Sequence, residues 1–201
     1  MDNKKVLVEV IQNHGIVYAK PGEEITLASG AKSKFYIDFD RLVMLPAGMH
    51  AIVDCLHDVL RKLDHNYAGH RVPSWDAFGG PSSGADPIVG AMMASLHLTN
   101  AITGKAVRGF KVRKEPKGRG PDAGAMIEGY LNPGDKAVLV EDVTTSGGSV
   151  LKAIAEVEKA GATVVKVITL LDRLAGAGEK LAKYEFEAIT TLNDLKIEIP
   201  A

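Results

Sequence analysis

The chain has 201 residues, which predicts one compact domain with room for at most a small appended lobe. Lys plus Arg total 24 and Asp plus Glu total 25, so the formal net charge is −1, and this near neutrality argues against a dedicated DNA or RNA binder. The single cysteine, Cys55, excludes an intramolecular disulfide and a zinc knuckle, and it fits a reducing compartment.

Targeting and membrane signals are weak in this sequence. The longest apolar runs are shorter than the roughly 18–20 residues that a membrane-spanning helix needs. Near the start of the chain, Glu9 and Gln12 stand where a signal peptide requires an unbroken apolar stretch. We therefore expect a cytoplasmic protein that binds neither membrane nor nucleic acid.

The first 45 residues are predicted to form a small hood over a larger domain. Apolar residues within 4–13 fall on one stripe, the spacing of a short amphipathic helix, and His14-Gly15 ends it. Short β-rich pieces follow, separated by turn residues, at 16–18, 24–27 and 35–42.

The rest of the chain, residues 46–201, alternates predicted helices with apolar strands. The predicted helices span 46–63, 87–98 and 149–159. The predicted strands span 74–78, 106–112, 136–140, 163–171 and 184–189, with a loop at 79–84 and a long, exposed, charged loop at 113–124. Strands that are apolar on both faces and alternate with helices predict an α/β fold, in which helices flank a central, mostly parallel sheet.

The most informative segment is residues 137–149, Ala-Val-Leu-Val-Glu-Asp-Val-Thr-Thr-Ser-Gly-Gly-Ser. A buried strand delivers Glu141 and Asp142 to its carboxyl end, where ligands bind in open α/β sheets. Two adjacent carboxylates accept hydrogen bonds from a vicinal diol, or they hold a cation. The hydroxyl-rich and glycine-rich residues 144–149 then open a helix, whose first amides and positive dipole end favour a phosphate. Acids about one sugar's length from a phosphate cradle predict a ribose 5-phosphate site.

A tight strand-to-helix turn with a serine N-cap would explain a Gly-Gly turn by itself. The paired acids, the hydroxyl cluster and the apolar strand together favour the ligand site. The chain has no GxxxxGK[ST] sequence, and the glycines of 118–123 follow a charged stretch instead of a strand. Walker-type and Rossmann-type nucleotide binding are therefore disfavoured.

These residues carry a family resemblance. Segment 137–149 resembles the phosphoribosyl-pyrophosphate (PRPP) signature of the type I phosphoribosyltransferases, and three further segments resemble the orotate-specific members of that family. Residues 27–38 resemble their N-terminal hood motif, and residues 112–120 resemble their mobile catalytic loop. Leu171-Asp172-Arg173 resembles the strand end where the family places an orotate-binding arginine.

The resemblance implies transfer of the 5-phosphoribosyl group from PRPP to orotate in pyrimidine (UMP) synthesis, with Mg²⁺ on the pyrophosphate and no protein ligand to the metal assigned. It implies catalytic roles for Lys117, Asp142 and Arg119, and orotate contacts from Thr145, Arg173, Tyr36 and Ile37. PRPP would be bound by Arg113, Lys114, Lys117, Glu141, Asp142, Val143, Thr144, Thr145, Ser146, Gly147, Gly148 and Ser149.

The charged loop 113–124 is expected to be a mobile lid. A solvated loop is the usual fate of a charge run, but Gly and Pro spacing and four cations within residues 113–119 favour a lid. By resemblance, Arg113, Lys114 and Lys117 close over the pyrophosphate. The family's loop reaches into the neighbouring subunit's site, which implies a homodimer.

Three positions depart from the family pattern. Ala28 stands where many members have Lys, and the loop around Ser83 lacks the Lys that some members carry. Arg119 stands where the family's loop usually has His, which favours an electrostatic role over proton donation. Two alternatives stay open. The first is a transferase for another base, such as a purine, which has no carboxylate for Arg173 to bind. The second is a non-catalytic PRPP-sensing or nucleotide-sensing regulator, which would not require the intact lid.

Overall fold

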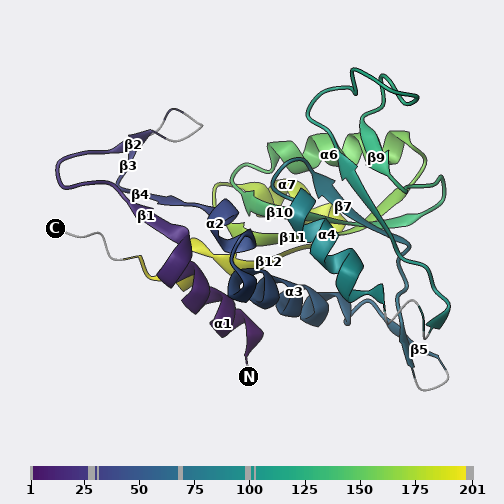
Figure 1. Cartoon of the computed structure of the whole chain (residues 1–201), viewed down its shortest axis with the longest axis horizontal. Helices are drawn as coiled ribbons and strands as arrows, with labels where there is room; N and C mark the ends of the chain where they lie inside the picture. Colours follow the sequence, from purple (N-terminus) through teal and green to yellow (C-terminus); the bar gives the residue numbers. More distant parts are fainter. Residues whose placement is uncertain are drawn as a thin grey trace.

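The computed structural model describes residues 2–26, 30, 32–67, 70–97, 101 and 103–197, and a six-stranded sheet forms its centre (Figure 1). The strand order is β12-β11-β10-β7-β8-β9, and all neighbours pair in parallel except β8 and β9. The predicted mostly parallel α/β sheet is confirmed. Its strands are β7 (Ala77–Pro81), β8 (Arg108–Val112), β9 (Ile127–Gly129), β10 (Lys136–Thr144), β11 (Thr163–Asp172) and β12 (Phe186–Thr191).

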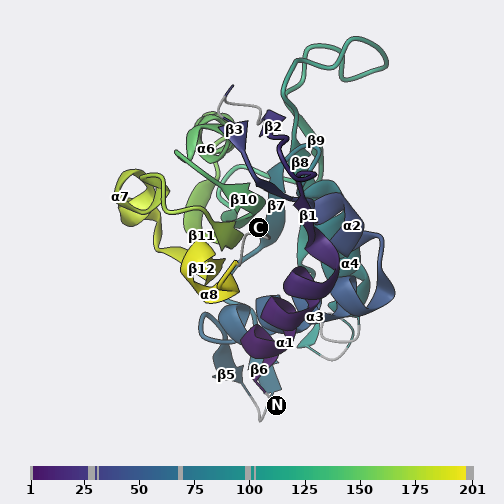
Figure 2. The ribbon, with the colours of Figure 1, turned by 90° about the vertical axis from the view of Figure 1, so that its left-hand side faces the viewer.

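Helices cover both faces of this sheet, as Figures 1 and 2 show. One face carries α1 (Asn3–Val10), α3 (Pro46–Leu60) and α4 (Asp86–Ser95), and the other carries α6 (Gly148–Lys159). Side chains of β10 alternate between the two: Val138 and Val140 join one hydrophobic cluster, and Ala137 and Leu139 join the other. Such a strand is buried on both faces, which explains its continuous apolar sequence.

The N-terminal region forms an arm beside the main sheet (Figure 1). Helix α1 continues into a π-helical turn, η1 (Ile11–Gly15), and β1 (Ile16–Tyr18) then pairs antiparallel with β4 (Phe35–Ile37). A second antiparallel pair joins β2 (Ile25–Thr26) to β3 (Lys32–Ser33). Leu7 and Ile11 are fully buried in the same cluster as α3, so this region shares the core of the main sheet.

The predicted strand over 35–42 is wrong beyond residue 37. The Asp38 carboxylate accepts a hydrogen bond from the backbone N–H of Arg41 at 3.3 Å, and helix α2 (Phe39–Val43) follows. An aspartate that caps a helix terminates the strand before it, and this preference outweighs the β-rich composition of the segment.

The predicted strand 74–78 and loop 79–84 are also displaced, because β7 begins at Ala77 and includes Gly79, Gly80 and Pro81. A Cβ atom on Gly79 would lie 2.5 Å from the Phe110 carbonyl oxygen of β8. These glycines therefore allow close packing around a central strand, whereas the sequence alone favours a turn at Gly-Gly.

The remaining predicted elements shift by a few residues at their ends, and 113–124 contains neither helix nor strand, as predicted. Several short elements were not predicted besides α2, β3 and β9. They are β5 (His65–Tyr67), β6 (His70–Val72), α7 (Ala177–Leu181), the 3₁₀ turn η2 (Ala182–Tyr184) and α8 (Leu192–Leu195). No helix within the described residues is long and apolar enough to cross a membrane.

Candidate active site

Two adjoining cavities open at the carboxyl edge of the sheet, beyond the ends of β7, β10 and β11. The larger has a volume of about 760 Å³ and the smaller about 160 Å³. Asp142 of β10 and Asp40 of α2 line both of them. The carboxyl ends of neighbouring parallel strands lie at one edge, which brings these segments together from distant parts of the sequence.

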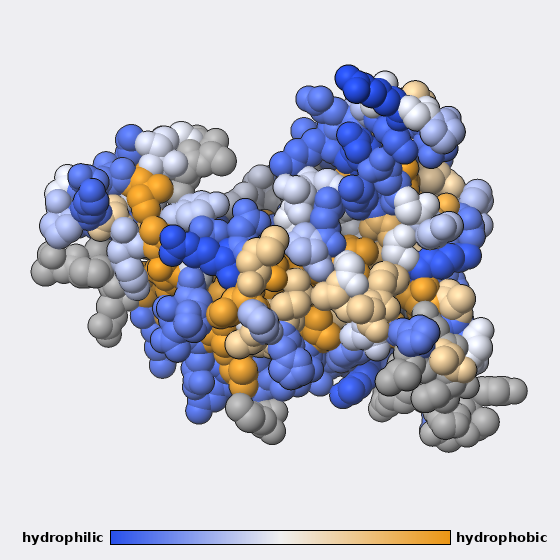
Figure 3. Space-filling view, in the orientation of Figure 1, coloured by the Kyte–Doolittle hydropathy of each residue, from blue (hydrophilic) through white to orange (hydrophobic). Residues whose placement is uncertain are grey.

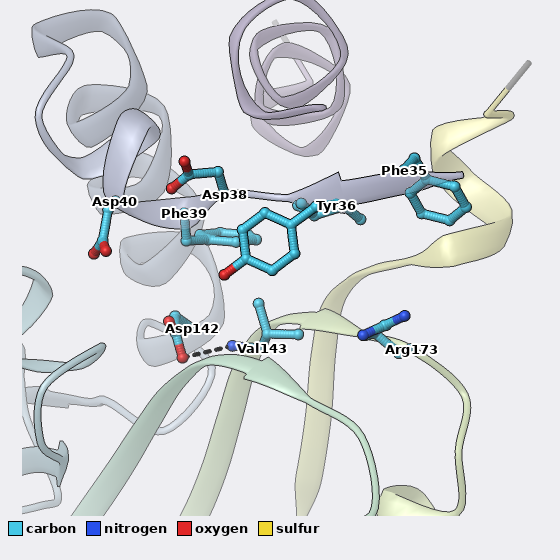
Figure 4. A pocket seen from close by; sticks show the side chains of 9 residues that line it. Phe35, Tyr36, Asp38, Phe39, Asp40, Asp142, Val143 and Arg173 are labelled. Atoms are coloured by element: carbon cyan, nitrogen blue, oxygen red, sulfur yellow. Dashed lines mark hydrogen bonds between the residues drawn. The ribbon is translucent and has the colours of Figure 1, made fainter. Parts of the chain in front are cut away.

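The smaller cavity lies between β4 of the N-terminal region and the ends of β10 and β11 (Figure 4). Phe35, Tyr36 and Ile37 of β4 form one wall, and Val143 lies opposite. Arg173, directly after β11, is the one cationic side chain among the described residues that line this cavity. A narrow slot with aromatic walls and one guanidinium suits a flat, negatively charged ring. Tyr36, Ile37 and Arg173, predicted to bind the base, thus meet here, whereas Thr145 does not line this cavity.

The larger cavity combines acids, hydroxyls and cations. Its polar lining comes from α2, the segment after β7, the end of β10, the first turns of α6 and the start of the charged loop. These residues are Asp40, Ser82, Ser83, Arg113, Lys114, Glu141, Asp142, Ser149, Lys152 and Glu156. Such a lining fits a ligand that carries sugar hydroxyls and phosphate groups together.

The two predicted acids differ in environment. Glu141 is 7% exposed, and burial, followed by the neighbouring charge of Asp142, raises the pKa of its carboxyl to about 9. Glu141 therefore carries a proton at neutral pH in the ligand-free chain, and the Ser149 hydroxyl donates to it at 3.2 Å. Asp142 is more open, and its carboxylate accepts the Val143 backbone N–H at 2.8 Å (Figure 4).

Gly84 makes room for Asp142. A Cβ atom on Gly84 would lie 2.5 Å from the carboxyl carbon of Asp142, a separation that side chains do not tolerate. Glycine at this position therefore lets the Asp142 carboxylate lie against the segment after β7. A larger residue would displace the acid that borders both cavities.

The N-terminus of α6 has no side-chain cap. Gly147 adopts the left-handed conformation with φ +75°, and the Ser149 hydroxyl bonds to Glu141 instead of capping the helix. The serine N-cap alternative is therefore wrong. The first amides of a helix have no acceptor within the helix, and a terminus without a side-chain cap suits an anion.

The hydroxyls between the strand and α6 occupy unlike positions. Thr144 is 1% exposed, and its hydroxyl lies 3.3 Å from the Asp172 carboxylate at the end of β11. This side chain joins two strand ends and does not line either cavity. Thr145 and Ser146 are exposed, and neither of them lines either cavity. Helix α6 begins at Gly148.

The charged loop projects away from the sheet between β8 and β9, and it is strongly hydrophilic (Figures 1 and 3). Backbone hydrogen bonds tie its two sides together, from Arg113 N to Met126 O at 2.8 Å and from Lys117 N to Ala125 O at 2.9 Å. Arg113 and Lys114 line the larger cavity, but Lys117 and Arg119 do not. The predicted catalytic cations at 117 and 119 thus lie outside both cavities in this conformation.

The sequence prediction missed three groups of cavity residues. Asp40 was not predicted as a site residue, because its segment was predicted to be a strand. In the structure it lies in α2 and lines both cavities. Lys152 lies three residues after Ser149, a helical spacing that could have identified it. Ser82, Ser83 and Gly84 also line the larger cavity. By resemblance this segment corresponds to the family's pyrophosphate loop, but no site residue was assigned to it. Ala28 lies outside the described residues.

Comparisons with known proteins give a consistent result. The family profile described as Phosphoribosyl transferase domain matches residues 50–196. The orotate phosphoribosyltransferase of Rhodopirellula baltica is 41% identical over 177 residues, covering 87% of this chain and 86% of that protein. The one from Pyrococcus abyssi is 36% identical over 184 residues, covering 92% of this chain and 89% of that protein.

Solved structures are similar over nearly the whole chain. The orotate phosphoribosyltransferase of Mycobacterium tuberculosis in complex with PRPP has a TM-score of 0.71 and 26% identity, covering 97% of this chain and 99% of that chain. The adenine phosphoribosyltransferase of Thermoanaerobacter pseudethanolicus has a TM-score of 0.61 at 16% identity, covering 92% and 99%, a likeness of fold alone.

Proposed function

The chain belongs to the orotate phosphoribosyltransferase family, and on this premise we propose that it transfers the 5-phosphoribosyl group of PRPP to orotate. The products are orotidine 5'-phosphate and pyrophosphate, as in pyrimidine synthesis. The observation that carries the proposal is that two cavities of different chemistry meet at Asp142. The reacting sugar carbon would lie at this junction, with the base on one side and the pyrophosphate on the other.

The ribose 5-phosphate half of PRPP would be held by β10 and α6. Asp142 and the protonated Glu141 would bind the sugar hydroxyls, since one accepts and the other both donates and accepts hydrogen bonds. The backbone from Thr145 to Ser149 would bind the 5-phosphate, which the uncapped helix terminus supports. Val143 and Thr144 would contribute backbone, because the Thr144 hydroxyl is already bonded to Asp172.

In the transfer step, the bond from the ribose carbon to the pyrophosphate oxygen breaks, and a bond to the orotate nitrogen forms. The sugar passes through an oxocarbenium-like state, so neutralising the leaving group matters more than a strong base. Arg113 and Lys114 already line the larger cavity, and Lys117 of the partner subunit would join them when the partner's lid closes. Arg119 would add positive charge, and Arg173 would pair with the orotate carboxylate.

Mg²⁺ would enter on the pyrophosphate and neutralise part of its charge. Asp40 and Asp142 offer carboxyl oxygens to the larger cavity, the donor type that Mg²⁺ prefers, so the lining fits the ion. Within the described ranges, no group of three or more His, Cys, Asp or Glu side chains is arranged to hold a metal by itself.

The homodimer is part of this proposal, with the lid of each subunit closing over its partner's site. Lys117 and Arg119 lie outside the cavities of their own chain, which supports such an exchange. The proposed compartment is the cytoplasm, and the buried free thiol of Cys55 is compatible with reducing conditions there.

The test is to incubate the purified protein with PRPP, Mg²⁺ and one base at a time. Loss of orotate absorbance is expected with orotate, and no nucleotide is expected with adenine or hypoxanthine. Turnover of a purine in preference to orotate would overturn the assigned base. PRPP binding without turnover of any base would instead identify a PRPP sensor.

A further inference from the structure

Glu128 of β9 is the meeting point of three cations at the base of the lid. Its carboxylate lies 3.0 Å from the Arg113 guanidinium, 3.4 Å from the Lys111 ammonium and 3.4 Å from the Lys117 ammonium. Lys111 lies directly opposite Glu128 in the antiparallel β8–β9 pair. The Glu128 carboxylate therefore forms ion pairs both with Lys111 of β8, the strand that leads into the lid, and with Arg113 and Lys117 of the lid itself.

The charge balance around Glu128 is uneven. Two further acids approach the edges of the group: Asp86 lies 3.7 Å from Lys111, and Asp122 lies 3.6 Å from Lys117. Arg113 has no second acid within the described residues, although its Nε donates to the Glu115 carbonyl oxygen at 3.1 Å. The hydrogen bond from Arg113, followed by those from Lys117 and Lys111, lowers the pKa of Glu128 below its ordinary value. Glu128 is thus ionised at neutral pH.

The position of Glu128 connects it to the reaction. Arg113 lines the larger cavity while it holds Glu128, and Lys117 is kept outside the cavity by Glu128 and Asp122. A pyrophosphate group carries more negative charge than one carboxylate and binds a guanidinium through two oxygens. Pyrophosphate in the chain's own cavity would therefore compete with Glu128 for Arg113, and pyrophosphate in the partner subunit's site would compete with it for Lys117.

We propose that Glu128 is a positioning residue that holds Arg113 and Lys117 when no pyrophosphate is bound, and that pyrophosphate displaces it from them. When pyrophosphate leaves, Glu128 takes the two cations back, so it weakens pyrophosphate binding and speeds product release. This inference rests on the proposed function, because it assigns these cations to the pyrophosphate of PRPP.

Glu128→Gln tests the inference, since it removes the charge and keeps the size of the side chain. We expect pyrophosphate with Mg²⁺ to bind to this variant at least about threefold more tightly, measured by titration calorimetry, because its cations have lost a competing anion. In steady-state kinetics with orotate, KM for PRPP and kcat should both fall. A residue that merely supported the lid would weaken binding and raise KM instead.

Two variants control for charge and for folding. Glu115→Gln removes a negative charge from the same loop, at an exposed side chain with no ion pair among the described residues, and should change pyrophosphate affinity less than about twofold. Glu128→Asp retains the carboxylate and should bind pyrophosphate like the unaltered protein. Melting temperatures establish that each variant is folded.

Unchanged or weaker pyrophosphate binding in Glu128→Gln would overturn the inference, as would equal tightening in Glu115→Gln. Trypsin digestion without ligand gives a readout that is independent of turnover. Cleavage after Lys117 should be faster in Glu128→Gln, because the lysine is held by one acid fewer. If pyrophosphate binding and cleavage respond as expected but orotate is never consumed, the proposed function fails and the role of Glu128 stands.

Discussion

At the scale of single residues, Glu141 and Asp142 show how neighbours in sequence acquire different chemistry. Ser149 of α6 reaches Glu141, whereas Asp142 packs against Gly84 and borders the cavity under the hood. Burial is what keeps Glu141 protonated at neutral pH. A protonated Glu141 carboxyl can donate a hydrogen bond to a bound diol as well as accept one.

Glu141→Gln should stabilise the ligand-free protein in a pH-dependent way. The folded chain holds a proton with a pKa of about 9, while the unfolded chain loses it near 4.5, so ionisation costs stability as pH rises between these values. The variant should unfold with a free energy higher by up to about 5 kcal/mol at pH 8, given about 1.4 kcal/mol for each pH unit between the unfolded pKa and pH 8.

Urea unfolding of both proteins at pH 4 and pH 8 measures this effect. At pH 4 both should have the same stability, because the carboxyl is protonated in both states. The control for loss of a negative charge is Glu115→Gln, because the Glu115 side chain is exposed. Its stability should change by the same small amount at both pH values. A difference that is equal at both pH values would contradict a raised pKa.

Lys117→Ala should lower kcat by about a hundredfold or more, the usual cost of removing one preorganised charge contact to a transition state. Folding should hardly change, because Lys117 lies in a loop that projects from the sheet. Steady-state assays and melting curves measure the two effects. Lys180→Ala, at an exposed position on α7, is the matched control. Near-full activity in Lys117→Ala would remove this lysine from the lid's proposed role.

At the scale of elements, the ends of β10 and β11 are joined beyond their ladder. The Arg173 backbone N–H donates to the Thr144 carbonyl at 2.9 Å, and Asp172 accepts both the Thr144 hydroxyl and the Leu174 N–H, at 3.3 and 3.0 Å. The strand that leads to the proposed phosphate loop thereby fixes the turn that presents Arg173 to the base.

Thr144→Val should therefore raise KM for orotate several-fold and lower stability by about 1 kcal/mol, because a buried hydrogen bond to a carboxylate is lost without a change of size. Thr144→Ser keeps the hydroxyl and should restore both values. Kinetics with each substrate varied in turn will separate the effects. A larger change in Thr144→Ser than in Thr144→Val would mean that the methyl group, and not the hydrogen bond, positions this turn.

At the scale of the whole molecule, the proposed exchange of lids between subunits makes activity depend on both chains. Lys117→Ala and Asp142→Asn should each be nearly inactive by themselves. In a hybrid dimer, one site would receive both defects and the other neither, so random mixing should recover roughly a quarter of the normal activity. Unfolding and refolding the two variants together, followed by the orotate assay, measures this recovery. No recovery, in dimers shown to be hybrid, would place each lid over its own site.

The predictable parts of the protein are contiguous in sequence. The apolar strand, the acid pair, the hydroxyl-rich turn and the helix of 137–159 follow one another, and backbone preferences, hydrophobic periodicity and turn chemistry act over such distances. The same local signals identified the alternating α/β pattern and the charged loop. They failed at Gly79 and Asp38, where a glycine served close strand packing and an aspartate began a helix.

Properties that depend on contacts between distant segments came only from the tertiary structure. Four features of the site bring together residues that are distant in sequence, so no local pattern reveals them. They are the slot between Tyr36 and Arg173, the place of Asp40 beside Asp142, the burial that keeps Glu141 protonated, and the cations around Glu128. Sequence alone thus determined which groups the chain carries to the sheet edge. Folding decided which of them meet, because charge and hydrogen bonding act through space and burial changes their strength.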